Sequence, residues 1–435
     1  MKDPHNNQHA WYRLDTSAKI YPALESPENT NIFRFSMTLK HSIDPSVLHR
    51  ALETLRPRFP YYNVRLRRGL FWYYLEKNEK PFIIWPETPY PCERLYPSYN
   101  NGYLYRVRVY KARIAVEFSH ILSDGSGCME FLKTLVTQYL LLEGSIGAIP
   151  EGVMDPQDTP AAEEYEDAFP RVLEIEKHRL KDVPKERSLF STQRVFKIRG
   201  NLLPLGAFRI ISGVVAMKDI KSVAKAYQAK VTEFLAALYI EALIHIQNTQ
   251  IRNRKKHRPV GLSIPVNMRN LYPVRSMRNF SLFIVPRIDP AKVRDLGDII
   301  GLLKTFVRTR ASRDNLLAMV KDNCSLSSNA LIKNTPVPVK DLVIRYVSNT
   351  QGHAQFSGTL SNLGAVRLPD ALEEHVEHMG FMLGPPTQTL TACAVLGYNN
   401  ALHITFGRVC QEAGVERHVF RRLVELGAHV RIISN

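Results

Sequence analysis

The sequence predicts an α/β protein built from two domains, and three observations support this prediction. The chain has 435 residues, more than one hydrophobic core usually supports. Strand patterns and helical stripes alternate through its first part, and the same mixture restarts near Phe208. A stretch of different composition separates the two parts. We therefore expect an N-terminal domain over 1–150, a crossover linker over 151–205 and a C-terminal domain over 206–435.

The first part of the chain begins with a strand, a helix and two hairpins. Alternating apolar residues predict the strand over 31–39. Asp44 followed by Pro45 has the pattern of an N-cap with proline at the first helical position, so a helix should begin there. Two further pairs of alternating segments predict hairpins over 64–74 and 103–119.

One stretch joins a strand directly to a helix. Residues 113–119 alternate between apolar and polar side chains, and apolar residues over 128–142 fall on one helical face. His120 follows the strand, and the turn Asp124-Gly125-Ser126-Gly127 leads into the helix. A junction of this kind can hold an imidazole ring rigidly while the ring faces a cavity.

His120 has two possible interpretations. A histidine at a strand end is often a core residue satisfied by the backbone, and Asp-Gly is ordinary turn chemistry. A neutral imidazole is also well suited to act as a general base near neutral pH. We favour catalysis because of the strand-to-helix setting and the further motifs described below.

The crossover linker and the second part follow. Residues 151–187 are rich in Asp, Glu and Pro at first and in Lys and Arg later, which predicts a solvent-exposed crossover with a short helix near 172–180. A helix capped by Thr232 is expected next to a helix over 217–228. The other predicted elements are strands over 208–215, 260–269, 281–285, 356–360, 376–382, 390–396 and 402–406, and helices over 296–307, 315–320, 339–347 and 415–426.

Several short motifs occur in order along the chain. They are Trp11-Tyr12-Arg13-Leu14-Asp15, His120-x-x-x-Asp124-Gly125, Pro265-Val266-Asn267-x-Arg269, Arg278-Asn279-Phe280 and Ser361-Asn362-Leu363-Gly364. Together they resemble the CoA-dependent acyltransferase superfamily, which includes chloramphenicol acetyltransferase, the alcohol acetyltransferases and the condensation domains of peptide synthetases. The resemblance implies two chloramphenicol acetyltransferase-like domains, each an α+β two-layer sandwich. It also implies a channel between them, which donor and acceptor enter from opposite faces.

The resemblance also implies roles for individual residues. His120 matches the general base. Asp124 matches an aspartate that turns away from the substrate and pairs with an arginine, for which Arg269 is the candidate. Gly125 would let the backbone or a pantetheine arm approach closely. Ser361 and Asn362 are candidates for stabilising the oxyanion, although an ordinary turn after a strand explains these two residues nearly as well.

Two departures from the family patterns narrow the expected function. Condensation domains usually carry a second histidine directly before the motif, where this chain has Ser119, and the Asp-Phe-Gly-Trp-Gly motif of the plant acyltransferases is absent. We therefore expect a stand-alone, alcohol O-acetyltransferase-like enzyme. It would move an acyl group from an acyl-CoA or acyl-carrier thioester to a small-molecule alcohol or amine, with no permanently bound cofactor. The alternative is a non-catalytic, condensation-like protein that binds an acyl carrier or a partner protein.

The composition bears on partners and location. The net charge of +17 favours anionic partners, such as the phosphates of coenzyme A, although solubility explains part of the surplus. Nucleic acid is not expected, because no recognised binding motif accompanies the charge. No apolar run approaches the roughly 20 residues that span a bilayer. Residues 1–7 are polar and resemble no signal peptide, so we expect a cytoplasmic protein.

Metal and disulfide sites are not expected. The five cysteines are scattered and form no Cys-x-x-Cys pair. His375 and His378 lie on a predicted strand, which places them on opposite faces of a sheet. Cys128 lies on the apolar face of its predicted helix, which favours a packing role over a reactive thiol.

Overall fold

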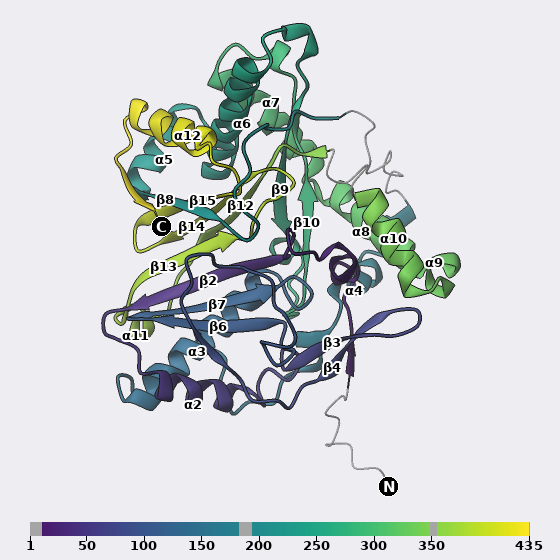
Figure 1. Cartoon of the computed structure of the whole chain (residues 1–435), viewed down its shortest axis with the longest axis vertical. Helices are drawn as coiled ribbons and strands as arrows, with labels where there is room; N and C mark the ends of the chain where they lie inside the picture. Colours follow the sequence, from purple (N-terminus) through teal and green to yellow (C-terminus); the bar gives the residue numbers. More distant parts are fainter. Residues whose placement is uncertain (1–10, 182–193, 349–354, 435) are drawn as a thin grey trace.

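The computed structural model describes residues 11–181, 194–348 and 355–434. These residues form two lobes, each with a β-sheet flanked by helices (Figure 1). The predicted mixed α/β class is therefore confirmed. The polar start of the chain, over 1–7, lies outside the described residues.

The N-terminal lobe is built on a five-stranded sheet in the order β13-β2-β7-β6-β5. Helices α2 and α3 pack together beneath this sheet in Figure 1 and bury their apolar stripes. The Asp44 side chain accepts a hydrogen bond from the Ser46 amide at 2.8 Å, so the predicted N-cap of α2 is confirmed. The bounds are α1 Tyr21–Leu24, β2 Ile32–Leu39, α2 Pro45–Leu55, β5 Ile84–Pro86, β6 Tyr105–Tyr110, β7 Arg113–Ser119, α3 Gly125–Glu143, α4 Ala168–Ile175 and α11 Asp370–Glu373.

One strand of the N-terminal sheet comes from far along the chain. β13, Val376–Leu383, pairs antiparallel with β2 and places Phe381 opposite Phe35. The two rings stack with their centroids 4.7 Å apart. The next strand, β14, belongs to the other sheet. The N-terminal lobe is therefore completed by residues from the C-terminal part of the sequence.

The C-terminal lobe contains a mixed sheet in the order β10-β9-β12-β14-β15-β8-β16, with β11 paired to β9. β12 runs parallel to both of its neighbours, whereas the outer pairs are antiparallel. Apolar side chains of helices α5, α6, α7 and α12 pack with those of the sheet in the core of this lobe. The bounds are β8 Arg209–Ala216, α5 Met217–Ala226, α6 Val231–Gln250, β9 Val260–Asn267, β10 Ser281–Ile284, β11 Arg287–Ile288, α7 Leu296–Arg310, β12 Gly358–Ala365, β14 Thr391–Tyr398, β15 Ala401–Arg408, α12 Gly414–Glu425 and β16 Val430–Ser434.

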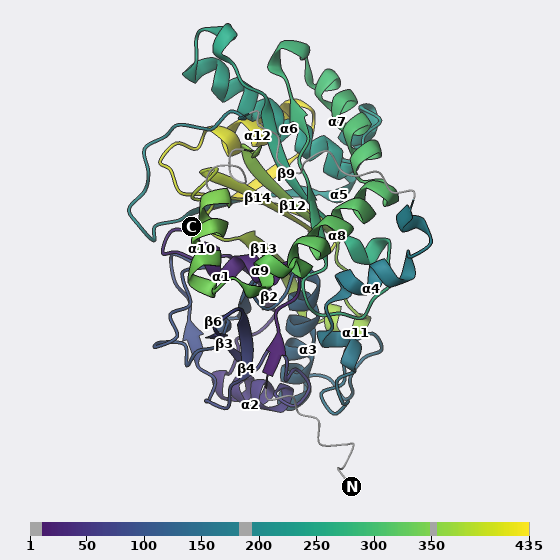
Figure 2. The same ribbon diagram turned by 90° about the vertical axis from the view of Figure 1, so that its right-hand side faces the viewer.

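A third sheet and a helical arm add contacts between the lobes. The sheet contains β1 Trp11–Arg13, β4 Tyr73–Lys77 and β3 Val64–Arg68. The arm consists of α8 Arg313–Ser328, α9 Ala330–Asn334 and α10 Val337–Val347, and it crosses one side of the molecule (Figure 2). The Tyr73 hydroxyl donates to Asp341 Oδ2 at 2.7 Å, and Lys340 Nζ donates to the Phe71 carbonyl at 2.6 Å. The arm is thus held against the N-terminal lobe.

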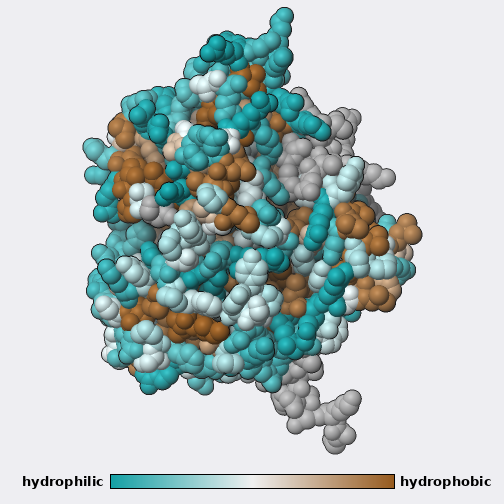
Figure 3. Space-filling view, viewed as in Figure 1, coloured by the Kyte–Doolittle hydropathy of each residue, from teal (hydrophilic) through white to brown (hydrophobic). Residues whose placement is uncertain are grey.

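Apolar surface gathers on the outer side of α10. Val339, Leu342 and Val343 are about half or more exposed, and brown surface covers the arm at the right of Figure 3. The inner side is different, because Lys340 lies with its Nζ 3.4 Å from the ring centroid of Trp72. Within the three described ranges, no helix combines the length and the hydropathy needed to cross a membrane.

The crossover linker differs from its prediction. Its helix is α4, which begins at Ala168 rather than near 172 because the Asp167 side chain caps it, accepting from the Phe169 amide at 3.2 Å. The stretch is also not uniformly exposed to solvent. Glu164 is buried and accepts two hydrogen bonds from Arg58, at 2.6 and 2.9 Å. Residues 182–193 of the linker lie outside the described residues.

Two turn and cap predictions in the second part are wrong. Thr232 does not cap α6. The helix begins at Val231, with Lys230 at the N-cap position, and the Glu233 side chain accepts from the Lys230 amide at 2.9 Å. Residues 361–364 do not form a turn after a strand, because they lie inside β12. The prediction ended that strand too early, since the polar residues there still pair with β14.

Candidate active site

His120 stands between β7 and the loop that leads into α3. Its backbone amide donates to the Asn31 carbonyl at 2.9 Å, which fixes the loop to the residue before β2. The imidazole stacks on Tyr21, with centroids 5.2 Å apart, and lies 4.5 Å from the ring of Phe33. The residue as a whole is half-buried, and its ring is packed between Tyr21 and Phe33.

The environment of His120 favours its neutral form. Burial lowers the pKa of the imidazole below its ordinary value, and the hydrogen bond to Asn279, the charge of Asp124 and the Ser123 backbone only partly offset this effect. A neutral imidazole carries one N–H and one free lone pair. It can therefore accept a proton at neutral pH.

Asn279 fixes the direction in which the His120 ring can donate. Its Nδ2 group donates to Asp15 Oδ2 and to the His120 carbonyl, both at 2.9 Å. These two acceptors lie on the amide nitrogen side, so Oδ1 must face His120 Nδ1, at 3.4 Å. Since an amide oxygen only accepts, this contact favours the tautomer with the proton on Nδ1 and the lone pair on Nε2.

Asn279 and Asp15 received no role in the sequence analysis. Both are buried, and Asp15 also accepts from the Ala18 amide at 2.7 Å. Burial raises the pKa of Asp15, and the nearby Asp167 carboxylate adds to the rise. The sequence feature that could have pointed to these residues is their place in two of the motifs described above, Trp11 to Asp15 and Arg278-Asn279-Phe280. Sequence spacing does not reveal that these motifs meet at His120.

Asp124 connects the two lobes beside His120. Its Oδ1 accepts from the amides of Ser126 and Gly127, at 3.1 and 3.4 Å, and so caps α3. Its Oδ2 accepts from Arg269 Nη1 at 2.7 Å and from the Phe280 amide at 2.8 Å. Arg269 also donates to two backbone carbonyls of the loop before β10. The carboxylate therefore ties the start of α3 to the C-terminal lobe.

The two glycines after Asp124 have different surroundings. A Cβ added at Gly125 would lie 3.2 Å from Leu363 Cδ2 and 3.5 Å from the ring of Phe35, both side-chain atoms. A Cβ added at Gly127 would overlap Ser123 Oγ, the Met277 carbonyl and the Tyr62 hydroxyl. Gly127 is therefore required by packing, whereas Gly125 lies beside side chains that can shift.

We expect Gly127→Ala to destabilise the fold by about 1–3 kcal/mol, because overpacking forces backbone and side chains to move. Thermal unfolding followed by circular dichroism measures this effect. Gly147→Ala is the matched control, since a Cβ there meets nothing within 4 Å. Equal melting temperatures for the two variants would contradict the packing argument.

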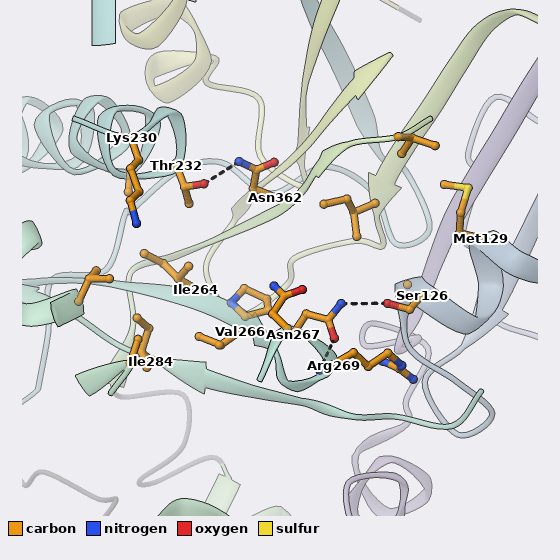
Figure 4. Close-up of a pocket in the computed structure, with 18 of the residues that line it drawn as sticks. Ser126, Met129, Lys230, Thr232, Ile264, Val266, Asn267, Arg269, Ile284 and Asn362 are labelled. Atoms are coloured by element: carbon orange, nitrogen blue, oxygen red, sulfur yellow. Dashed lines mark hydrogen bonds between the residues drawn. The ribbon is translucent and has the colours of Figure 1, made fainter. Parts of the chain in front are cut away.

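A cavity of about 650 Å³ opens beside the start of α3. Gly125, Arg269 and Asn362 line it from three different elements (Figure 4). Asn362 Nδ2 donates to Thr232 Oγ1 at 2.8 Å, and Asn267 Nδ2 donates to Ser126 Oγ at 3.2 Å, so polar side chains link the cavity walls. The structure thus brings Gly125, Arg269 and Asn362 together around one space. Neither His120 nor Ser361 belongs to its described lining.

Cys128 and His378 lie in packed surroundings. Cys128 is fully buried, and burial raises the pKa of its thiol well above the ordinary value. The His378 ring lies 4.4 Å from that of His403 in an edge-on contact. Among the described residues, no group of three or more His, Cys, Asp or Glu side chains is placed to hold a metal ion.

Comparison with known proteins establishes the fold. No protein-family model matches the chain, and no curated protein does. A solved mutant of the starter condensation domain of rhizomide synthetase RzmA, in complex with C8-CoA, matches with a TM-score of 0.60 and 14% identity, covering 96% of this chain and 94% of that one. Polyketide synthase associated protein 5 from Mycobacterium tuberculosis matches with a TM-score of 0.60 and 13% identity, covering 95% and 96%.

An epimerization domain is similar to the same extent. The domain from the third module of tyrocidine synthetase B matches with a TM-score of 0.58 and 11% identity, covering 96% of both chains. These similarities extend over nearly the whole length of this chain and of each of the three solved chains. The resemblance drawn from the motifs is thus confirmed at the level of the fold, which is that of the condensation domains.

Proposed function

We propose that this protein is an acyltransferase that moves an acyl group from a thioester to an alcohol or amine, with His120 as the general base. The observation that carries the proposal is the imidazole of the half-buried residue His120, whose Nδ1 faces the Asn279 amide oxygen. That contact favours the tautomer with its lone pair on Nε2, and this lone pair can accept a proton. A thioester donor is supported by the solved RzmA domain with the same fold, which was crystallised with C8-CoA.

The proposed reaction takes place in two steps. Nε2 of His120 accepts the proton of the acceptor O–H or N–H as its heavy atom attacks the thioester carbonyl. A tetrahedral oxyanion forms and the imidazole becomes positively charged. The oxyanion then collapses, the carbon–sulfur bond breaks, and the imidazolium returns its proton to the departing thiolate. His120 is neutral again, and the products are the ester or amide and a free thiol.

Asn279 and Asp124 act as positioning residues in this proposal. Asn279, held by Asp15, keeps the ring in the Nδ1–H tautomer. Asp124 braces the loop that carries His120 through its contact with Arg269. Asn362 remains the better of the two oxyanion candidates, because its amide has a second N–H besides the one bonded to Thr232, and it borders the cavity. Ser361 is the second candidate.

Product analysis by mass spectrometry tests the proposal. Purified protein is incubated with a panel of acyl-CoAs and with alcohols and amines, beside protein without acceptor. New esters or amides with release of free CoA are the expected result. Binding of acyl-CoA without any turnover across the panel would contradict the proposal and favour a non-catalytic binding protein.

The pH dependence of turnover gives a second test. Because burial lowers the pKa of His120, we expect the acidic limb of the kcat/KM profile to be centred below about 6.5, the pKa of free histidine. The rate falls at low pH because only the neutral ring can accept a proton, and acid converts the ring to its charged form. Initial rates between pH 4.5 and 8.5 measure the profile. An acidic limb centred above the free value would be incompatible with a desolvated base.

A further inference from the structure

The cavity beside α3 has an aliphatic lining that the proposed reaction step does not use. Its floor is formed by Ile264 of β9 and Ile284 of β10, which lie directly opposite each other in the antiparallel ladder. Leu303 and Val307 of α7 and Ala236 of α6 also line it. No Phe, Tyr or Trp belongs to its described lining. Without a ring to stack on, the cavity offers little to a planar aromatic group and suits a flexible hydrocarbon chain.

Polar side chains line the cavity at two places, Thr232 with Asn362 at one and Ser126 with Asn267 at the other (Figure 4). Gly125 and Ser126 at the start of α3 and Asn267 at the end of β9 form the part closest to the Asp124 loop. Lys230 and Arg275 also line the cavity and are exposed, and the Lys230 side chain points toward Ile264 in Figure 4. The lining thus combines aliphatic and polar side chains, and a volume of about 650 Å³ lies within the usual range of small-molecule sites.

We propose that this cavity binds the saturated hydrocarbon chain of a substrate and that Ala236 determines how long a chain can enter. Ala236 of α6 lines the cavity with the smallest apolar side chain among its aliphatic neighbours Ile264 and Leu303, so a larger residue there would reduce the volume. The proposal rests on the proposed acyltransferase function for its biological meaning. The chain could belong to the thioester donor or to the alcohol acceptor, since both carry the same chemistry.

Filling the cavity tests the proposal. Ala236→Phe is compared with the unmodified protein in two pairings, octanoyl-CoA with ethanol and acetyl-CoA with 1-octanol. We expect at least a tenfold loss of kcat/KM in one pairing, larger than any loss with acetyl-CoA and ethanol, because a difference of even one methylene changes selectivity by about 10- to 200-fold. The pairing that loses activity identifies the molecule whose chain occupies the cavity. Ala226→Phe, at an exposed position of α5, is the matched control.

Two further measurements keep the test decisive. Val307→Phe fills the same cavity from the half-buried face of α7, in case Ala236→Phe fails to fold. Isothermal titration with octanoyl-CoA and with 1-octanol measures binding without turnover. If neither filling variant changes binding or chain-length preference, the cavity proposal is overturned and the acyltransferase function stands. If binding weakens but no pairing gives product, the cavity proposal stands and the acyltransferase function falls.

Discussion

His120→Ala should lower kcat/KM for acyl transfer by about 10²- to 10⁴-fold, the usual contribution of a positioned general base. Without the imidazole, solvent water must take the proton of the acceptor as it attacks. The fold should persist, because the loop stays attached through the backbone contact between His120 and Asn31 and through the Asp124 contacts. Initial rates with the preferred pair of substrates give the catalytic effect, and circular dichroism gives the state of the fold.

A second histidine provides the control for this experiment. His49→Ala makes the same change at an exposed position of α2 and should leave both rate and melting temperature unchanged. Full activity in the His120→Ala protein would reject the base assignment. Substrate binding should be retained in that variant, which separates a loss of chemistry from a loss of affinity.

Asp124→Asn should destabilise the fold by about 3–5 kcal/mol, the usual cost of removing one partner from a buried ion pair. The Asp124 and Arg269 side chains are 7% and 16% exposed, so solvent cannot replace the lost charge. An asparagine could still accept from the Ser126 amide, but its NH2 group would then face two donors, Arg269 Nη1 and the Phe280 amide. Chemical denaturation measures the change, and the rate of acyl transfer should fall together with stability.

An Asp→Asn substitution at the start of another helix separates the effect of losing the ion pair from the effect of changing the helix cap. Asp44→Asn changes the cap of α2, where the carboxylate accepts from Ser46 and no arginine pairs with it among the described contacts. Stability should change little there. If Asp124→Asn lowered the rate and left unfolding unaltered, Asp124 would act in the chemistry and not as a brace.

Local signals predicted the helices and strands that surround the site. The Asp44-Pro45 pattern identified the start of α2, and the alternation before His120 identified β7 with its correct ends. Such features depend on neighbouring residues, so a sequence contains them directly. Thr232 shows the limit of this approach, because a good capping residue was present but its hydroxyl accepts from Asn362 on a distant strand.

Only some of the site residues could be predicted from the sequence. The resemblance named Asp124 and Arg269, whose atoms lie 2.7 Å apart although 145 positions separate them. It gave no role to Asn279, which is 159 positions from His120, or to Asp15, which is 264 positions from Asn279. Contacts of this kind are set by how the lobes meet, and no periodicity or spacing encodes them. The cavity was missed for the same reason, since its walls come from several separate elements.

The late position of β13 in the chain has a consequence for biosynthesis. A ribosome completes β2 early but adds β13 only after it has translated residues 120–375. Until then, the nascent N-terminal sheet carries an open edge along β2, and unpaired strand edges readily pair with other polypeptides. Prematurely terminated products that lack 376–383 should therefore precipitate or stay bound to chaperones, even though they contain every residue from β2 to α3.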